Sequence, residues 1–208
     1  MRQEQTTVQS EILMIDTSPR GEKSASRQVA KYLLAVLTNP NSNIIYRDLA
    51  REAPPHIDSN FLDSFLTRLE ERTSEHQRAL AYSDMLTNEF LSASTVIIST
   101  PMWNFGIPST LKSWIDHIVR MGLTVTYRDN GFEGLAVNKK IYVIVGSGHV
   151  YSHDPLAMMD ALTPSIRAAF AFIGAYDVEF IQVEGTNIPD LRNRAIEKAI
   201  AKIDLQYK

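Results

Sequence analysis

Four hydroxyl side chains lie close together in the stretch DTSPRGEKSASRQVAKYL, residues 16–33: Thr17, Ser18, Ser24 and Ser26. An apolar run precedes the stretch and an amphipathic run follows it, which indicates a loop that leads into a helix. Amide groups at a helix N-terminus are unpaired donors with partial positive charge, and serine hydroxyls beside them add donors. This combination can bind a phosphate group without lysine or arginine. The competing interpretation is that Ser24 or Ser26 only caps the helix, a role that needs one hydroxyl.

A second segment, TPMWNFGIPSTLKSWIDHIVR at residues 100–120, offers a surface for a planar ring. Met102, Trp103 and Phe105 supply flat or polarisable groups beside the polar Asn104, and prolines on both sides restrict the backbone. Trp103 and Phe105 could also be ordinary core anchors, which is the commoner fate of isolated aromatic residues. Their place between two prolines, after an apolar run, favours a binding site.

Sharper nucleotide motifs are missing from the sequence, since no G-x-x-x-x-G-K-[ST] occurs. The stretch GSGHVY at residues 146–151 lacks the third glycine of a dinucleotide fingerprint and fits a tight turn equally well. His149, His153 and Asp154 would bind a metal only in helical register, and they follow a glycine turn. We therefore expect no metal site, and a solvated His149 rather than a proton donor.

The elements that must position these residues alternate between strand and helix. Short apolar runs predict strands, and apolar residues at helical spacing predict helices. The expected strands are 11–16, 43–49, 94–100, 140–147 and 176–185, and the expected helices are 24–38, 109–120, 156–172 and 189–205. This pattern predicts an α/β fold with a doubly wound, five-stranded parallel sheet and helices on both faces. Ligands of such sheets bind beyond the carboxyl ends of the strands, where both segments described above would lie.

We expect one domain over residues 1–208, with three additions to the plain alternation. Residues 1–9 form a polar N-terminal extension, residues 52–92 a mostly helical insertion, and residues 123–135 a hairpin with an Asp-Asn-Gly turn. The two internal insertions would shape a site or an interface.

Composition narrows the function classes. The chain has 21 basic and 24 acidic residues, a net charge of -3 and no cysteine. No basic cluster suggests a nucleic-acid partner, and no apolar run approaches the roughly 20 residues of a membrane span. The absence of cysteine and of a signal-peptide pattern favours the cytoplasm.

Over nearly its whole length the sequence resembles the FMN-dependent NADH-azoreductases, a branch of the flavodoxin-like quinone reductases. The stretches that carry the resemblance are SPRGEKSAS, PMWNFGIPSTLKSWIDHIVR, TYRDNGFEGL, GSGHVYS and FAFIGAYDVEFIQVEG, in the order and at the spacing of that family. The second and third stretches are the specific ones. The resemblance implies a flavodoxin-like fold, FMN as cofactor, NADH or NADPH as electron donor, and a homodimer.

The resemblance also implies roles for individual residues. Residues around the FMN phosphate would be Ser18, Ser24, Ala25 and Ser26; residues along the isoalloxazine ring and ribityl chain would be Met102, Trp103, Asn104 and Phe105; residues at an edge of the ring would be Ser147, Gly148 and His149. Tyr127 and Phe172 would approach the flavin of the neighbouring subunit and line the substrate pocket. The chain departs from the usual pattern at Trp103, where tyrosine is common, and at His149 and Val150, where glycine is frequent.

The function that follows is an FMN-dependent NAD(P)H oxidoreductase that reduces quinones and aromatic azo compounds by ping-pong, two-electron hydride transfer. Flavin would carry the chemistry, so no catalytic side chain is expected. The main alternative is a flavodoxin-like FMN electron carrier without a small-molecule substrate of its own, although such carriers are usually strongly acidic. A flavin-free binding module is the third possibility, and it would leave the hydroxyl loop as a capped turn.

Overall fold

A computed structural model describes residues 11–129, 131–153 and 155–207, and a parallel β-sheet lies at the centre of the molecule. Its five parallel strands follow the order β2-β1-β3-β6-β7. Their bounds are β1 Glu11–Asp16, β2 Asn43–Asp48, β3 Thr95–Pro101, β6 Lys140–Gly146 and β7 Asp177–Val183. The central strands β1, β3 and β6 are almost wholly buried, because parallel strands covered on both faces are continuous apolar runs. The predicted five-stranded parallel sheet is confirmed.

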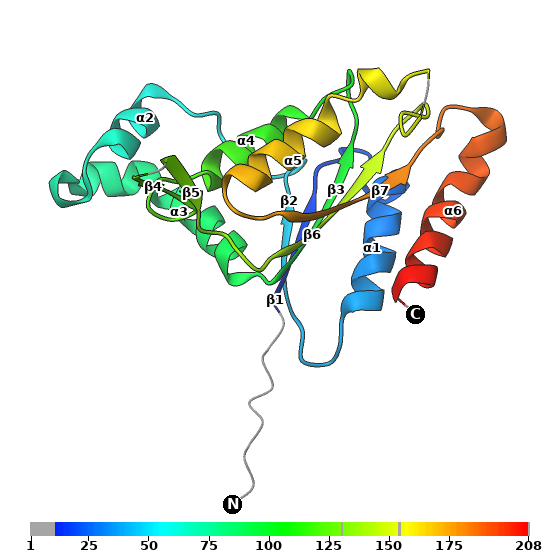
Figure 1. The fold of residues 1–208 in the computed structure, drawn as a ribbon, viewed down its shortest axis with the longest axis horizontal. Helices are drawn as coiled ribbons and strands as arrows, with labels where there is room; N and C mark the ends of the chain where they lie inside the picture. The colour runs from blue at the N-terminus through cyan, green and yellow to red at the C-terminus, as the bar shows by residue number, and fades with distance from the viewer. Residues whose placement is uncertain (1–10, 130, 154, 208) are drawn as a thin grey trace, which may run out of the picture.

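Helices cover both faces of the sheet, as Figure 1 shows. α1 (Ala25–Leu37) and α6 (Pro189–Tyr207) pack side chains such as Leu33 and Ile203 on one face. α3 (Ser74–Ser92), α4 (Ser109–Ile118) and α5 (Leu162–Phe172) cover the other face with large rings such as Phe90, Trp114 and Phe170. β2 lies on one side of β1, and β3, β6 and β7 lie on the other side. The topological switch point is therefore between β1 and β3, and the loops after these two strands flank it.

The start of α5 differs from the sequence-based expectation. The chain forms a short 3-10 turn at Ala157–Met159, and the α-helix begins only at Leu162. The carboxylate of Asp160 accepts a hydrogen bond from the Thr163 amide at 2.9 Å, which fixes the first turn at that point. Apolar residues before it suggested an earlier start, but Met158 is exposed.

Two segments extend away from the sheet. α2 (Ser59–Leu66) and a 3-10 turn (Leu69–Glu71) precede α3, and β4 (Val125–Arg128) pairs antiparallel with β5 (Gly131–Gly134) in a separate sheet. Figure 1 shows both on the side of the molecule away from α6. The predicted N-terminal extension 1–9 and the turn residue Asn130 lie outside the described residues.

His117, a buried residue of α4, binds the segment that precedes α2. The Nε2–H group of His117 donates to the Pro55 carbonyl at 3.0 Å, and the rings of Phe61 and Tyr82 meet the imidazole edge-on. Burial lowers the pKa of His117 below its usual value, and the Pro55 hydrogen bond offsets this only in part. The α2 segment therefore packs against a neutral imidazole at pH 7.

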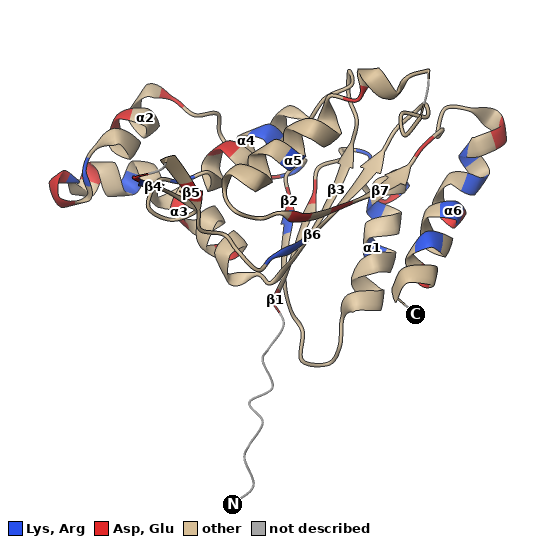
Figure 2. Ribbon diagram, viewed as in Figure 1, with Lys and Arg blue, Asp and Glu red and all other residues tan. Residues whose placement is uncertain are grey.

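Basic and acidic residues are interspersed along the elements, for example along α6 in Figure 2. Within the described ranges, none of the helices combines the length and the apolar character that a membrane crossing requires.

Candidate functional site

A pocket of about 170 Å³ lies at the carboxyl edge of the sheet. Four segments that are far apart in the sequence line it, and its residues lie within 18–26, 101–103, 146–148 and 186–187. Small-molecule sites in proteins usually measure roughly 300 to 1,000 Å³. The pocket therefore suits one end of a ligand, and the remainder must lie along the open edge.

The N-terminus of α1 forms one wall of the pocket. Ser24 occupies the N-cap position, yet its side chain makes no capping hydrogen bond. Its hydroxyl lies 3.1 Å from the hydroxyl of Ser26 instead, and both side chains are buried. The first amides of the helix, on Ala25 and Ser26, thus stay free of a cap. This geometry argues against the interpretation that the serines only cap the helix.

The chemistry of this wall fits a phosphate group. Ser18, Ser24 and Ser26 contribute hydroxyls, the helix N-terminus contributes amides, and Arg20 contributes a positive charge. Among the described residues that line the pocket there is no Asp or Glu. The charged side chain, the hydroxyls and the helix N-terminus of this wall therefore favour an anion.

The second wall is a tight turn after β3. Trp103 and Gly106 exchange two backbone hydrogen bonds, and the residues between them, Asn104 and Phe105, have φ values of 46° and 69°. Two consecutive positive φ values are the pattern of a type I′ turn, which is strained for a residue as large as phenylalanine. The Met102 amide donates to the Gly146 carbonyl at 2.8 Å, so the turn is fastened to the end of β6.

This turn presents its aromatic rings to solvent beside the pocket. Met102 and Trp103 line the pocket, and the Trp103 side chain is 50% exposed. Asn104 and Phe105 lie outside the lining, where the Phe105 ring meets Tyr151 edge-on at 6.1 Å between centroids. Trp103 and Phe105 are therefore surface groups at the site and do not anchor the core.

The third wall follows β6. Ser147 and Gly148 line the pocket, whereas His149 is exposed outside it. A Cβ atom on Gly148 would lie 2.4 Å from Nδ2 of Asn187, so only glycine fits beside that side chain in its present position. The carbonyls of Ser147, Gly148 and His149 accept from amides of the loop after β7. The Gly148 and His149 amides make no hydrogen bond in the part of the chain that is described.

The loop after β7 completes the pocket, and the sequence reasoning did not include it. The amide and hydroxyl of Thr186 both donate to the Ser147 carbonyl, at 3.1 and 2.9 Å, and the Asn187 amide donates to the Gly148 carbonyl at 2.9 Å. Thr186 and Asn187 line the pocket, as does Arg20. A usable signal existed, because this loop also follows the carboxyl end of a strand that pairs with β6.

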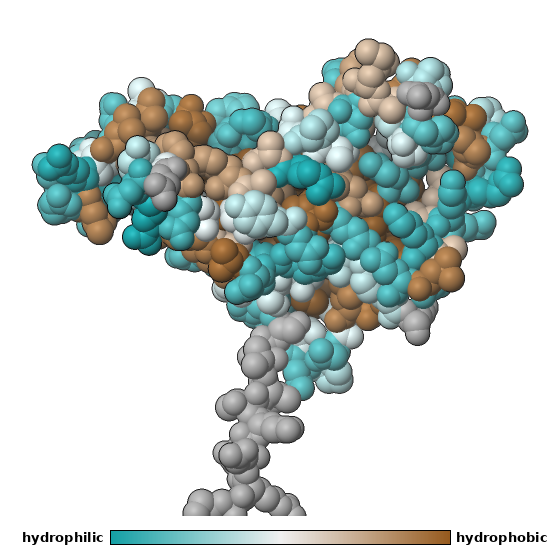
Figure 3. All heavy atoms as spheres, in the orientation of Figure 1, coloured by the Kyte–Doolittle hydropathy of each residue, from teal (hydrophilic) through white to brown (hydrophobic). Residues whose placement is uncertain are grey.

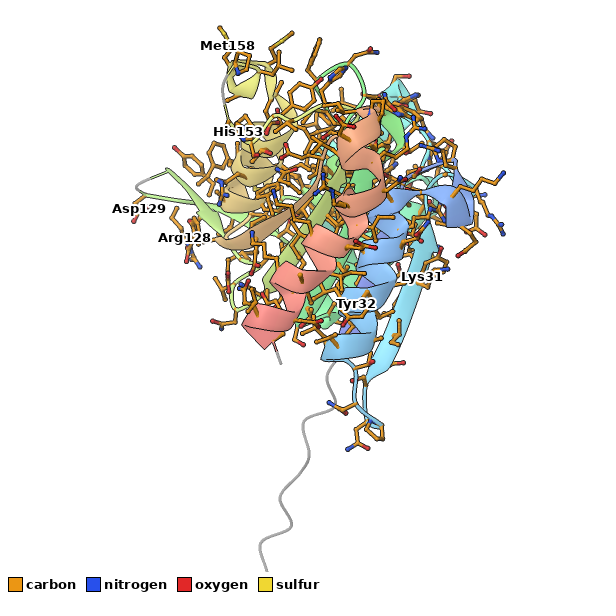
Figure 4. All side chains as sticks on the ribbon, turned by 90° about the vertical axis from the view of Figure 1, so that its right-hand side faces the viewer. Lys31, Tyr32, Arg128, Asp129, His153 and Met158 are labelled. Carbon is orange, nitrogen blue, oxygen red and sulfur yellow. The ribbon has the colours of Figure 1, made fainter. Side chains whose placement is uncertain are left out.

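Tyr127 and Phe172 belong to a separate aromatic cluster. The Phe132 ring contacts Tyr127 at 5.5 Å and Phe172 at 5.4 Å between centroids, which joins the β4–β5 hairpin to α5. Tyr127 is 68% exposed and Phe172 is 43% exposed. Figure 4 shows Arg128 and Asp129 at the tip of this hairpin, away from the sheet. Neither aromatic side chain lines the pocket of the same chain.

The histidine cluster after β6 is the remaining candidate from the sequence. His149 and His153 both lie on the surface after β6, while Asp154 falls outside the described residues. In the ranges that the structure covers, no three His, Asp or Glu side chains gather in an arrangement that could hold an ion.

Comparison with known proteins identifies the family. A family described by its flavodoxin-like fold matches residues 10–206. The FMN-dependent NADH:quinone oxidoreductase of Beijerinckia indica is 44% identical over 191 residues, which are 91% of this chain and 95% of that protein. The chain belongs to this flavodoxin-like family of FMN-dependent NADH:quinone oxidoreductases. Another member, from Azotobacter vinelandii, is 40% identical over 93% of this chain and 98% of its own length.

Solved structures in the same family share the architecture. An azoreductase from Bacillus anthracis superimposes with a TM-score of 0.86 at 27% identity, over 95% of this chain and 98% of its own. An FMN-dependent NADH-azoreductase of Bacillus anthracis, solved in complex with FMN, gives a TM-score of 0.83 at 26% identity, over 96% of this chain and all of its own. The predicted family and flavodoxin-like fold are confirmed.

Proposed function

We propose that this chain is an FMN-dependent NADH:quinone oxidoreductase that also reduces aromatic azo compounds. The observation that carries the proposal is the open N-terminus of α1, where uncapped amides and the paired Ser24 and Ser26 hydroxyls face a pocket free of carboxylates. The exposed turn at Trp103 lies beside it. The names of the relatives agree with this chemistry.

Each wall of the pocket has a part in holding the cofactor. The α1 wall binds the phosphate, the Trp103 turn offers a flat surface along the ring, and the Gly148 and His149 amides remain available as donors at the ring edge. FMN, when bound, supplies the hydride chemistry. The side chains therefore have to bind, orient and exclude water, and none has to act as a nucleophile.

We further propose a homodimer in which Tyr127 and Phe172 complete the substrate pocket of the partner subunit. Both side chains are exposed in the single chain, and apolar residues also gather over α2 in Figure 3, where Leu62 and Leu66 are exposed. Exposed apolar patches of this kind favour association. Sedimentation at micromolar concentration should give twice the mass of one chain, and a fully active monomer would contradict the proposal.

The shared pocket leads to a prediction for turnover. NADH and the acceptor would occupy the same space in turn, which is the ping-pong arrangement.

A cytoplasmic location, supported by the absence of cysteine, completes the proposal.

The test is to purify the chain, identify the released flavin by mass spectrometry and measure NADH and NADPH oxidation with and without quinone. FMN in the protein and quinone-dependent oxidation are the expected results. A yellow protein without quinone-dependent turnover would instead indicate an electron carrier, and a colourless protein that takes up no FMN would indicate a flavin-free module.

A further inference from the structure

A buried arginine lies next to the wall that the N-terminus of α1 and Ser18 form, for which we proposed the phosphate. Arg27 is in the first turn of α1 and is only 4% exposed. Its two terminal nitrogens form a bidentate contact, the fork, with the Asp48 carboxylate, and both hydrogen bonds measure 2.7 Å. The nitrogen NH2 also donates to the Ser18 carbonyl at 2.6 Å, and NH1 lies 3.3 Å from the Asp16 carboxylate. A single side chain thus joins β1, β2, α1 and the hydroxyl loop.

The acceptors of Arg27 are themselves fixed in place. Asp16 and Asp48 are the last residues of β1 and β2, which are neighbours in the sheet. Asp16 also accepts from the Ser99 hydroxyl and, at 2.7 Å, from the Tyr46 hydroxyl. The guanidinium group is therefore held by carboxylates at the ends of β1 and β2, and its NH2 nitrogen also donates to the Ser18 carbonyl, while Nε has no partner among the described residues.

This contact determines which way the Ser18 peptide faces. Ser18 lines the pocket, and a carbonyl oxygen turned toward a phosphate would repel it. The hydrogen bond from Arg27 orients the Ser18 carbonyl oxygen toward the protein interior. Asp16 and Asp48 both face Arg27, and the exposed Arg51 also lies 3.6 Å from Asp48, so the charge of Arg27 is compensated within this cluster.

We propose that Arg27 is a positioning residue for the cofactor phosphate, which acts by holding the Ser18 peptide in the orientation that accepts an anion. The inference rests on the proposed placement of the FMN phosphate at α1. It assigns a specificity role to a residue that does not line the pocket.

The measurement is the ratio of affinities for FMN and riboflavin, which differ by the phosphate alone. Both ligands are titrated into apo protein and followed by quenching of flavin fluorescence, with urea unfolding of each variant in parallel. Arg27→Lys keeps the charge but loses the fork, because a single nitrogen replaces the two planar nitrogens that contact both Asp48 oxygens and the Ser18 carbonyl. We expect its preference for FMN over riboflavin to fall about tenfold or more, through weaker FMN binding.

Arg47 provides the matched control. It forms a forked ion pair with Glu89 between β2 and α3, with Nε 2.8 Å from one carboxylate oxygen, and it does not line the pocket. Arg47→Met should lower stability and leave the FMN preference unchanged. Should Arg27→Lys fail to fold, Asp48→Asn weakens the same fork with Arg27 in place, and its preference should fall in the same direction.

The outcomes separate the two proposals. Wild-type protein without a preference for FMN would refute the phosphate site itself. Wild-type protein with the preference, and a folded Arg27→Lys or Asp48→Asn variant that keeps it in full, would overturn the role of Arg27. Equal losses in the Arg47→Met control would show that the preference follows stability alone and would overturn it too.

Discussion

Replacing Ser24 by Asp should move stability and cofactor affinity in opposite directions. Asp is a favourable N-cap residue, and its charge at a helix N-terminus is stabilising by about 0.3 to 1 kcal/mol. Ser24 makes no capping bond in the present structure, so the substitution removes none. The free energy of unfolding of the apo protein should therefore stay equal or rise by up to about 1 kcal/mol.

The same carboxylate should oppose FMN. The hydroxyls of Ser24 and Ser26 lie 3.1 Å apart, so an anion that contacts both would lie within about 4 Å of the new charge. A unit charge pair at about 4 Å repels by about 1 kcal/mol in water and about 4 kcal/mol at the effective dielectric of a protein surface. For this pocket, buried on one side and open on the other, we expect about 2 kcal/mol, which is roughly a 30-fold higher Kd.

Ser24→Asn is the control, since it has the shape of Asp without the charge and also caps helices well. FMN is titrated into both apo variants at low and high ionic strength, because salt should shrink the gap between them. Riboflavin should bind the two variants equally. Equal Kd values for FMN in Ser24→Asp and Ser24→Asn would refute the phosphate site at α1, whatever the stability data show.

Four further predictions test other parts of the molecule. Phe172→Ala should raise the KM for quinone more than it weakens FMN binding, and wild-type double-reciprocal plots at several quinone concentrations should be parallel; intersecting lines would exclude ping-pong turnover. Burial lowers the pKa of His117, so the unfolded chain takes up a proton first as the pH falls below about 6.5, and stability should drop from pH 7 to pH 5. Urea unfolding of His117→Gln should show a flatter pH profile, and an unchanged slope would count against this assignment. Lys139→Met should cost about 2 kcal/mol of unfolding free energy, because the ammonium group donates to the Leu91 and Ala93 carbonyls at 2.8 and 2.7 Å; a thermal melt that matches wild type would contradict it.

Sequence patterns predicted the sheet well because its central strands are buried on both faces and therefore appear as short apolar runs. Residues 11–16 were placed to the residue, and the other strands of the sheet within two positions at each end. The start of α5 was wrong because apolar spacing cannot distinguish a 3-10 turn from a helix when the deciding contact is the Asp160 side chain on Thr163.

For the site, the sequence identified the residues whose types carry chemistry, such as Ser24 and Trp103. It missed Thr186 and Asn187, whose roles depend on backbone contacts to Ser147 and Gly148 some 39 positions earlier. It also gave no sign that Arg27 is buried, because a charged residue at that spacing resembles an ordinary exposed helix position. The assignments of individual residues to FMN stay predictions until the titrations are done.

The hydrogen bonds from the loop after β7 to the loop after β6 also have a consequence for synthesis on the ribosome. The wall at residues 18–26 is made early, but the pocket is complete only when Thr186 and Asn187 are available. At the usual rate of about 5 to 20 residues per second, the ribosome needs roughly 10 to 30 s to cover that interval. FMN that binds as proposed would therefore meet a complete pocket only after residue 187 has been made. Chains that terminate before residue 186 also lack α6, which covers one face of the sheet, and should not retain the cofactor.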